Sequence, residues 1–348
     1  MYFSEYLPRL NSISVALDVQ SGFNIDEINR ISIAGELLSI EPKNNPPIDV
    51  HLPCKASQAS ITGLKLANNT VSFGVKIHEK RLDSTVPFTD QAIEKWSCKD
   101  LSQTPKIGRN HKFIFVCKNC NSELIDSSQY DFKDMPSEQW YEMMDFWHCH
   151  KPENHEKHKK EYKGILKPDN KTIIIGSYYL LEKSNRNIVK IQDSITCNKC
   201  GQLLGEMFQG TLKIFKWCVE LQFESGNAIH KEQYRPGLFI YNIILDKINF
   251  SAVRKFKIEV EAQSKFIWIM SLGLNVVIDG KICHNALKVL CADNVSKEES
   301  YETLDVPYPE VAKLFLNDIK TINSLMPVSM RSVSIGTDNY LISYLSYT

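Results

Sequence analysis

The sequence predicts an α+β protein that is predominantly antiparallel β. Short apolar runs, several with period-two alternation, recur along most of the chain, whereas helical periodicity is confined to a few segments. Two CxxC pairs bracket the middle of the chain. The predicted regions are a β-rich N-terminal region at 1–105, a four-cysteine β domain with a helical insertion at 106–222, and an α+β C-terminal region at 223–348.

Length and charge limit the classes of function. With 348 residues, 43% of them hydrophobic, the chain can bury more than one core. Lys plus Arg and Asp plus Glu both number 41, so the composition indicates no direct nucleic-acid partner and no membrane partner. The first residues lack the order of a signal peptide, and the longest apolar run, 266–278, is too short to span a bilayer.

We therefore expect a soluble protein made in the cytosol, where its ten cysteines stay reduced. In that compartment paired cysteines indicate a metal site or catalysis more often than disulfides.

The N-terminal region contains three predicted β segments. They are ISVALDV (13–19), ISIAGELLSI (31–40) and NTVSFGVKIHE (69–79), and the sequence PKNNPP at 42–47 separates the second from the third. Their branched and aromatic residues and their turn-forming boundaries predict a β-rich start to the protein.

The two CxxC pairs predict a metal site. Cys117 and Cys120 end the apolar run HKFIFVCKNC, and Cys197 and Cys200 have the same spacing, each pair being followed by a turn residue. Four thiolates satisfy a structural zinc ion tetrahedrally at about 2.3 Å. The long gap between the pairs suggests two hairpins of one sheet held together by the metal. Inert buried thiols remain an alternative, and a redox dithiol is disfavoured because such sites carry one CxxC pair at the start of a βαβ unit.

A helix is predicted between the pairs, in DMPSEQWYEMMDFWHCHKP (134–152). Asp134 is a candidate cap and Pro136 falls in the first turn. Large apolar residues recur at helical spacing, at Trp140, Met143, Met144 and Trp147. This stripe either packs on the sheet of its own domain or contacts a partner, with Trp140, Met144 and Trp147 as the binding residues.

The residues that follow this stripe, His148, Cys149 and His150, have three interpretations. They close the end of the helix, or Cys149 and His150 form a nucleophile and base, or the group joins His155 and His158 in a second metal site. The charged segment KPENHEKHKKEYK (151–163) has no apolar period and is predicted to be a solvated linker.

The C-terminal region mixes strands and helix. In KFKIEVEA (255–262) apolar residues alternate with polar ones, which predicts a half-buried strand. Other apolar runs that follow the second CxxC pair are LKIFKWCVEL, which lies at the end of the four-cysteine domain, LFIYNIIL and SKFIWIMSLGLNVVI. One helical face near the end, with Pro307 near its start, consists of Tyr308, Val311, Ala312, Phe315, Ile319 and Ile322.

Catalytic candidates are few. The chain lacks phosphate-loop, dinucleotide-binding, HExxH and GxSxG motifs, and the candidate catalytic thiols are Cys149, Cys283 and Cys291. Cys291 follows an apolar run in KICHNALKVLCADN, where a buried thiol has a raised pKa. His284 is next to Cys283, but neighbours on a strand point to opposite faces.

The pattern CxxC, long insertion, CxxC-G-x-L-L-G resembles the β-tent zinc domains of the Yippee-like and cereblon ligand-binding type. The residues that carry this resemblance are Cys117, Cys120, Cys197, Cys200, Gly201, Leu204 and Gly205. The resemblance implies a central β-tent-like zinc domain, and it implies a fold rather than an activity.

The order of features over 10–348 resembles the HECT-like, ubiquitin-conjugating-enzyme-binding family, whose fungal member is linked to cleavage and polyadenylation of messenger RNA precursors. The resemblance rests on the two CxxC pairs and on WHCH (147–150) between them. It also rests on Lys216 and Trp217, on Trp268, on LKVL (287–290) and on LMPVSMRS (325–332).

This resemblance implies a protein of the cytoplasm and nucleus that binds a ubiquitin-conjugating enzyme and supports the metallo-β-lactamase-type endonuclease of pre-mRNA 3′-end processing as an adaptor or chaperone. The alternative that it implies is a HECT-like ubiquitin ligase that forms a cysteine thioester with ubiquitin. The free cysteines discriminate these hypotheses, because only the ligase must lose function when one of Cys149, Cys218, Cys283 or Cys291 is replaced.

Overall fold

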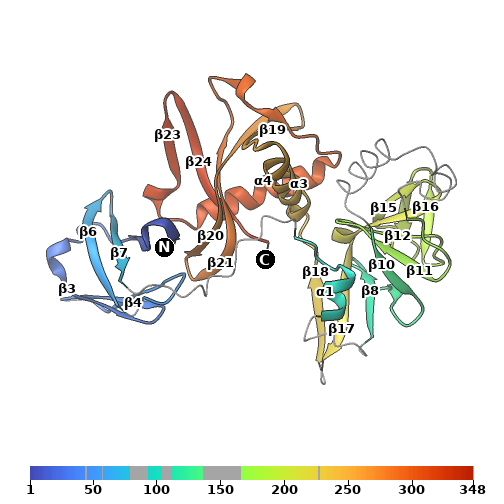
Figure 1. Ribbon diagram of the computed structural model, residues 1–348, viewed down its shortest axis with the longest axis horizontal. Helices are drawn as coiled ribbons and strands as arrows, with labels where there is room; N and C mark the ends of the chain where they lie inside the picture. Colours follow the sequence, from blue (N-terminus) through green and yellow to red (C-terminus); the bar gives the residue numbers. More distant parts are fainter. Residues whose placement is uncertain are drawn as a thin grey trace, which may run out of the picture. The chain divides into compact units, whose positions relative to one another are not determined.

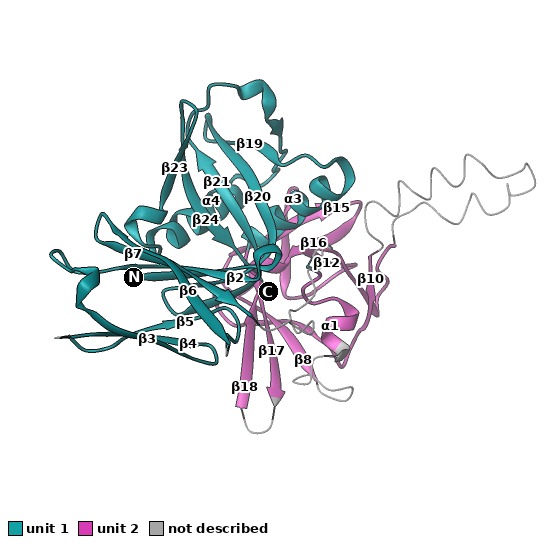
Figure 2. Ribbon diagram, turned by 60° about the vertical axis from the view of Figure 1, so that its left-hand side comes forward, with its two compact units in different colours: residues 1–93, 236–348 teal, residues 94–235 magenta. Residues whose placement is uncertain are grey.

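The computed structural model describes residues 1–43, 45–56, 58–78, 93–103, 112–135, 166–225 and 228–347. The predominantly antiparallel β architecture predicted from the sequence is confirmed: the described strands form four sheets, and most pairings are antiparallel. The chain divides into two compact units, shown in Figure 2. Unit 1 joins Met1–Ile93 to Pro236–Thr348, and unit 2 is Glu94–Arg235.

Unit 1 is built on a ten-stranded sheet that contains both ends of the chain (Figure 1). Its order is β23-β24-β21-β20-β1-β2-β7-β6, and β19 and β22 extend it beside β20. The pairing of Phe3 with Ile278 places β1 against β20. The strands are β1 (Tyr2–Leu7), β2 (Ser12–Asp18), β6 (Ala59–Ala67), β7 (Thr70–Ile77), β19 (Lys255–Val260), β20 (Gln263–Ile278), β21 (Lys281–Ala292), β22 (Glu302–Thr303), β23 (Ser332–Ile335) and β24 (Asp338–Leu345).

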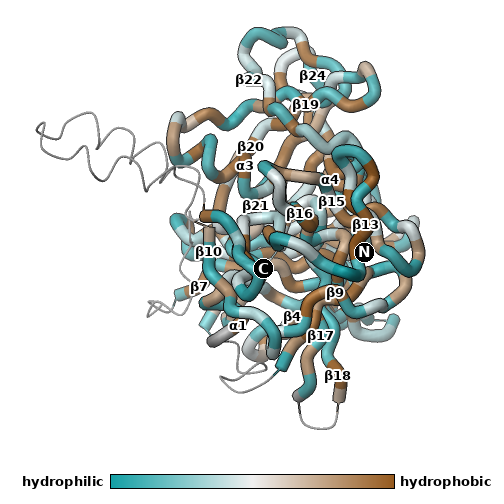
Figure 3. Tube along the Cα trace, turned by 90° about the vertical axis from the view of Figure 1, so that its right-hand side faces the viewer, coloured by the Kyte–Doolittle hydropathy of each residue, from teal (hydrophilic) through white to brown (hydrophobic). Residues whose placement is uncertain are grey.

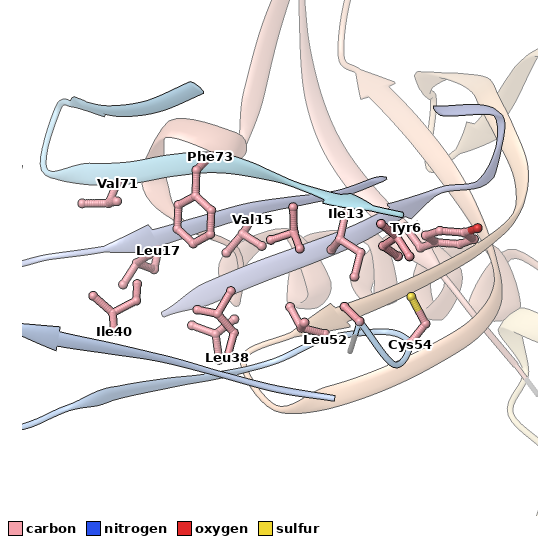
Figure 4. Packing of buried hydrophobic residues seen from close by; sticks show 14 residues of the cluster. Tyr6, Ile13, Val15, Leu17, Leu38, Ile40, Leu52, Cys54, Val71 and Phe73 are labelled. Carbon is pink, nitrogen blue, oxygen red and sulfur yellow. The ribbon is translucent and has the colours of Figure 1, made fainter. Parts of the chain in front are cut away.

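A three-stranded sheet of β3 (Ile28–Ala34), β4 (Leu37–Pro42) and β5 (Ile48–His51) provides a second layer. Apolar side chains of the two sheets meet in one buried cluster, in which Ile13, Val15 and Phe73 approach Leu38 and Ile40 (Figure 4). The N-terminal part of unit 1 is therefore a small β-sandwich held by interdigitated apolar side chains.

Two helices accompany the C-terminal strands, α3 (Gly237–Ser251) and α4 (Pro309–Ser324). Helix α4 buries the predicted face, including Val311, Phe315 and Ile319, and packs against β24. The run LFIYNIIL forms α3, which follows Pro236 and buries most of its first three turns. Short 3₁₀ helices complete the unit at Pro8–Leu10, Ile25–Glu27, Glu298–Ser300 and Val328–Met330.

Two turns differ from the sequence expectation. The segment 31–40 is not one strand but a hairpin, because Gly35 adopts a left-handed φ of 66° between β3 and β4. The run 255–262 ends as a strand at Val260, since Glu261 and Ala262 both take positive φ in the tight turn before β20.

Unit 2 contains a seven-stranded sheet and a four-stranded sheet. The seven-stranded sheet consists of β10 (Asp131–Asp134), β11 (Thr172–Ile175), β12 (Tyr179–Glu182), β13 (Ile188–Ile191), β14 (Ser194–Cys197), β15 (Leu203–Phe208) and β16 (Thr211–Phe215). The four-stranded sheet consists of β8 (Phe113–Cys117), β9 (Glu123–Asp126), β17 (Val219–Ser225) and β18 (Ala228–Gln233). Helix α1 (Cys98–Gln103) and the 3₁₀ turn η4 (Lys216–Cys218) complete it.

Residues of the predicted first and third regions belong together to unit 1. Along the strands of both units, apolar and polar positions follow one another closely, as the colouring of Figure 3 shows.

No helix within the described residues is long and apolar enough to cross a membrane.

Candidate metal centre

Two turns of the same design carry the four predicted ligands. In the first, the Cys117 amide donates to the Ser122 carbonyl and the Asn121 amide donates to the Cys117 carbonyl, both at 2.8 Å. In the second, the Cys197 amide donates to the Gln202 carbonyl and the Gly201 amide donates to the Cys197 carbonyl, also at 2.8 Å. We call each of these CxxC turns a knuckle.

The residue after each second cysteine has a left-handed backbone, with φ of 55° at Asn121 and 71° at Gly201. Asparagine and glycine are the residues that adopt this conformation most readily. This requirement explains the turn residue that follows each CxxC pair in the sequence, and it turns both cysteines of a pair to the same side of the knuckle.

The knuckles face one another, so that the four sulfur atoms all lie within 4.8 Å of each other. The Sγ atoms of Cys117 and Cys200 are 3.7 Å apart, and those of Cys120 and Cys197 are also 3.7 Å apart. Within the described residues this is the cluster whose geometry can hold a metal ion. The four sequence-predicted ligands are therefore brought together.

These distances can be compared with a tetrahedral thiolate site. Metal–sulfur bonds of about 2.3 Å at tetrahedral angles separate neighbouring sulfur atoms by about 3.8 Å. The two shortest cross-knuckle distances have this value. Four sulfur ligands also leave no position for water, which is typical of a structural metal rather than a catalytic one.

The four cysteines come from two sheets rather than from two hairpins of one sheet, which corrects the expectation from the gap length. The first knuckle joins β8 to β9 in the four-stranded sheet, and the second joins β14 to β15 in the seven-stranded sheet. Among the described strands, those of one sheet do not pair with those of the other. Sequence alone cannot show this, because the membership of the two sheets is set by long-range pairings such as β8 with β17 and β12 with β16.

Ser122 is a site residue that the sequence analysis missed. Its Oγ lies 3.3 Å from the sulfur of Cys120 and 3.3 Å from that of Cys197, so one hydroxyl contacts a ligand from each knuckle. Its hydrogen bonds lower the pKa of Cys120 to about 6, whereas burial raises the pKa of Cys117 to about 12. A hydroxyl between two sulfurs favours the thiolate form that a metal requires. A serine two residues after a CxxC pair is too common to have shown this.

Two catalytic candidates belong to unit 1, whereas the four sulfurs belong to unit 2. Cys283 and Cys291 are both on β21, and their side chains are 4% and 8% exposed. Burial, and secondarily Asp293, raises the pKa of Cys291 to about 11. His284 is exposed while Cys283 is buried, and its Nδ1 lies 3.2 Å from Oδ1 of Asn275. The strand thus separates this cysteine and histidine as alternation predicts.

The predicted insertion helix and its neighbours fall outside the described residues. This applies to Trp140, Met143, Met144, Trp147, His148, Cys149, His150, His155 and His158. Asp134, the candidate cap, is the last residue of β10, and its Oδ1 accepts a hydrogen bond of 2.8 Å from the Cys98 amide.

Comparisons with known proteins give related sequences. A family model described as HECT-like ubiquitin-conjugating enzyme (E2)-binding matches residues 5–337. The uncharacterized protein YJR141W of Saccharomyces cerevisiae is 28% identical over 97% of this chain and 98% of its own length. The uncharacterized protein C1734.10c of Schizosaccharomyces pombe is 25% identical over 53% of each chain. No solved structure matches significantly.

Proposed function

Because the chain belongs to the HECT-like ubiquitin-conjugating enzyme (E2)-binding family, we propose that it binds a ubiquitin-conjugating enzyme non-covalently, and that it does not form a ubiquitin thioester. The family supports the conjugating enzyme as a partner. The burial of Cys283 and Cys291, the two candidate thiols within the described residues, supports the second half of the proposal.

A cysteine that accepts ubiquitin must be reached by the charged enzyme and must ionise readily. The described cysteines outside the knuckles are Cys54, Cys98, Cys218, Cys283 and Cys291. Three of them, Cys54, Cys283 and Cys291, are buried. Burial, and secondarily Asp134, also raises the pKa of the half-buried Cys98 to about 12. These environments favour neutral, inert thiols.

We further propose that the metal is zinc, held by Cys117, Cys120, Cys197 and Cys200. The all-thiolate set and the 3.7 Å cross-knuckle distances support this choice, since zinc readily accepts four sulfur ligands in tetrahedral geometry. When bound, the ion supplies a rigid crosslink between the two sheets of unit 2.

The surface beside the second knuckle is the proposed contact with the conjugating enzyme. Val189 and Leu203 flank Thr196 in one row across β13, β14 and β15, and Ile191 lies two residues further along β13. All three apolar side chains are exposed. A metal-held scaffold would present this patch in a fixed geometry, which lowers the ordering cost of binding.

The sequence resemblance supports a second partner, the endonuclease of pre-mRNA 3′-end processing, for which the protein would act as adaptor or chaperone. For this role we propose that the protein is present in the cytoplasm and the nucleus. Pull-down of the tagged full chain followed by mass spectrometry tests it. The endonuclease subunit is expected among the captured proteins, and its absence from a fraction that contains the conjugating enzyme would remove this role alone.

The covalent question is tested by mixing the protein with a charged conjugating enzyme and ubiquitin. We expect no thiol-sensitive ubiquitin adduct and a modest increase in ubiquitin discharge to free lysine. Variants Cys149→Ser, Cys283→Ser and Cys291→Ser should behave like the wild type. A reducible adduct that one of these substitutions abolishes would establish the ligase instead.

The proposed contact is tested with Ile191→Asp and Leu203→Asp. Each should weaken binding of the conjugating enzyme on the order of tenfold or more, because a buried unpaired charge replaces an apolar contact. The matched control is Ile229→Asp, at an exposed isoleucine on β18 of the same unit. Equal binding by all three variants would show that the enzyme contacts another surface.

A further inference from the structure

We propose that Lys216 positions residues 94–97 as a supporting element of the metal centre, so that the seating of this segment and metal binding stabilise one another. This inference rests on the proposed binding of zinc. It adds to the four ligands a part of the chain that lies outside the predicted metal domain.

Residues 94–97 are the first residues of unit 2, and Trp96 is the most deeply buried of them. Its side chain is 0% exposed, and its ring lies 5.4 Å from that of Phe115 and 6.1 Å from that of Tyr234. Its backbone φ is 61°, a left-handed conformation that is costly for a bulky residue. Such strain persists where the surroundings over-determine the conformation.

Polar contacts fix the tryptophan in this conformation. Its amide donates to Oδ2 of Asp100 at 2.7 Å, and its indole nitrogen donates to Oε2 of Glu232 at 3.4 Å. Lys95 donates from Nζ to the Gln233 carbonyl at 3.1 Å. The segment is therefore bound to the end of unit 2 as well as to its core.

Lys216, in the 3₁₀ turn η4, makes a hydrogen bond to residues 94–97. Its side chain is 1% exposed, and its Nζ donates to the Lys95 carbonyl at 2.6 Å and to the Ser177 carbonyl at 3.4 Å. A buried amino group without acceptors is unfavourable, whether charged or neutral, so these carbonyls stabilise the buried position of Lys216. If residues 94–97 leave, Lys216 loses its shortest bond.

The same short turn also holds the first knuckle. At the other end of η4, the Cys218 carbonyl accepts a hydrogen bond of 3.2 Å from the Lys118 amide, inside the knuckle. Cys117 pairs with Val219, the residue after the turn. A second connection runs through Phe115, which contacts Trp96 and lies two residues before Cys117 on β8.

Two short paths thus join the segment to a ligand, one through Lys216 and η4 and one through Trp96 and β8. Coupling between two binding events is reciprocal. Metal binding should favour the seated segment, and the seated segment should raise the affinity for metal by the same factor.

The test is a double-mutant cycle in the full chain, with Lys216→Met, Trp96→Ala and the two together, read as zinc affinity against a chromophoric chelator. Each single variant should weaken zinc binding by up to about tenfold, the lower end of the effect of direct outer contacts, because both residues act on the ligands through an intervening residue. The double variant should be no weaker than either single variant by more than about twofold, because both remove the same support. Losses that multiply would overturn the coupling.

Hydrogen exchange of the zinc-loaded protein is a second measurement. It distinguishes a local effect on residues 94–97 from general destabilisation, which would speed exchange throughout unit 2. Lys216→Met should speed exchange at Lys95, Trp96 and Ser97 and leave the amides of β14 and β15 unchanged. Lys231→Met is the control, since this lysine of the same unit is half-exposed and pairs with Glu220 at 3.4 Å. Trp96→Phe, which keeps a ring but loses the bond to Glu232, replaces Trp96→Ala if that variant does not fold.

The outcomes separate the coupling from the metal proposal. A wild type that binds no zinc overturns both. A wild type that binds zinc, together with a Lys216→Met variant whose affinity is within twofold of Lys231→Met, overturns only the coupling.

Discussion

Lys216 is a lysine whose charge is poorly accommodated in the folded protein. Burial lowers its pKa to about 7, although Asp134, Asp100, Glu94 and Cys98 oppose the shift. The unfolded chain keeps an ordinary lysine pKa of about 10.4. Between about pH 7 and 10 the unfolded state therefore binds a proton that the folded state does not, and the free energy of unfolding should rise with pH in this window.

Urea unfolding of the wild type and of Lys216→Met at intervals from pH 7 to 9 tests this. The wild type should gain stability relative to the variant by at most about 1.4 kcal/mol per pH unit. Lys231→Met should follow the wild type. Parallel curves for wild type and Lys216→Met would mean that the amine titrates alike in both states.

A single sulfur ligand should decide metal occupancy. We expect purified Cys197→Ser to contain less than about half an equivalent of zinc, because a tetrahedral structural site needs all four ligands. Cys291→Ser, which changes a cysteine of unit 1, should keep full occupancy. Elemental analysis gives the answer directly, and full occupancy in Cys197→Ser would exclude this ligand set.

At the scale of residues, the ligands could be predicted and their supports could not. The CxxC spacing and the following turn residue are local, so Cys117, Cys120, Cys197 and Cys200 are visible in the sequence. Ser122 acts on a sulfur 75 positions away, and Lys216 on a carbonyl 121 positions away. No local pattern encodes such contacts.

At the scale of elements, the insertion helix remains a prediction with two readings. Trp140→Ala combined with Met144→Ala should leave a folded, zinc-loaded protein that loses a partner, if the stripe is a binding surface. If the stripe is core, the same change should cost several kcal/mol of stability, about 2–5 per large buried side chain. Pull-down and thermal unfolding of one preparation distinguish the readings.

Lys157→Ala with Lys160→Ala, in the charged segment that follows, is the control and should change neither measurement. A Trp140 and Met144 double variant that keeps its stability and every partner would refute both readings and identify the insertion as a linker.

Elements with a clean period were found where the sequence placed them. Strand β19 alternates over Phe256, Ile258 and Val260, and α4 buries the stripe that includes Phe315. The apolar run in α3 has no such period, since it is buried on most sides, and its helix could not be inferred from alternation. Turn conformations at Gly35 and Ala262 decided the strand ends.

At the scale of the whole molecule, chelation should affect the two units differently. A metal held by the four cysteines would crosslink both sheets of unit 2, and in small metal-held modules binding free energy is part of folding free energy. A strong chelator should therefore unfold residues 111–221 and leave the sheets of unit 1 protected. Hydrogen exchange before and after chelation measures both in one experiment.

Loss of the conjugating enzyme and of the endonuclease in pull-downs should accompany this unfolding. A melting profile and a set of partners that chelation leaves unchanged would show that the metal has no structural role.

The division into units could not be derived from sequence. Composition and motif order separate the two ends of the chain, but β1 pairs with β20 and so places them in one sheet. Unit 2 also begins at Glu94, before the predicted start of the metal domain at residue 106. Trp96 belongs to this unit because it packs against residues such as Phe115, which lie further along the chain.

The position of β1 also sets an order of assembly on the ribosome. Phe3 emerges before unit 2, whereas its partner Ile278 is synthesised only after all of unit 2. At about 5–20 residues per second, this strand waits about 15–55 s for its second neighbour. Unit 2 can finish folding in that interval, while one edge of β1 stays open to pairing with other chains. A nascent chain stalled before residue 263 is therefore the species that we expect chaperones to protect.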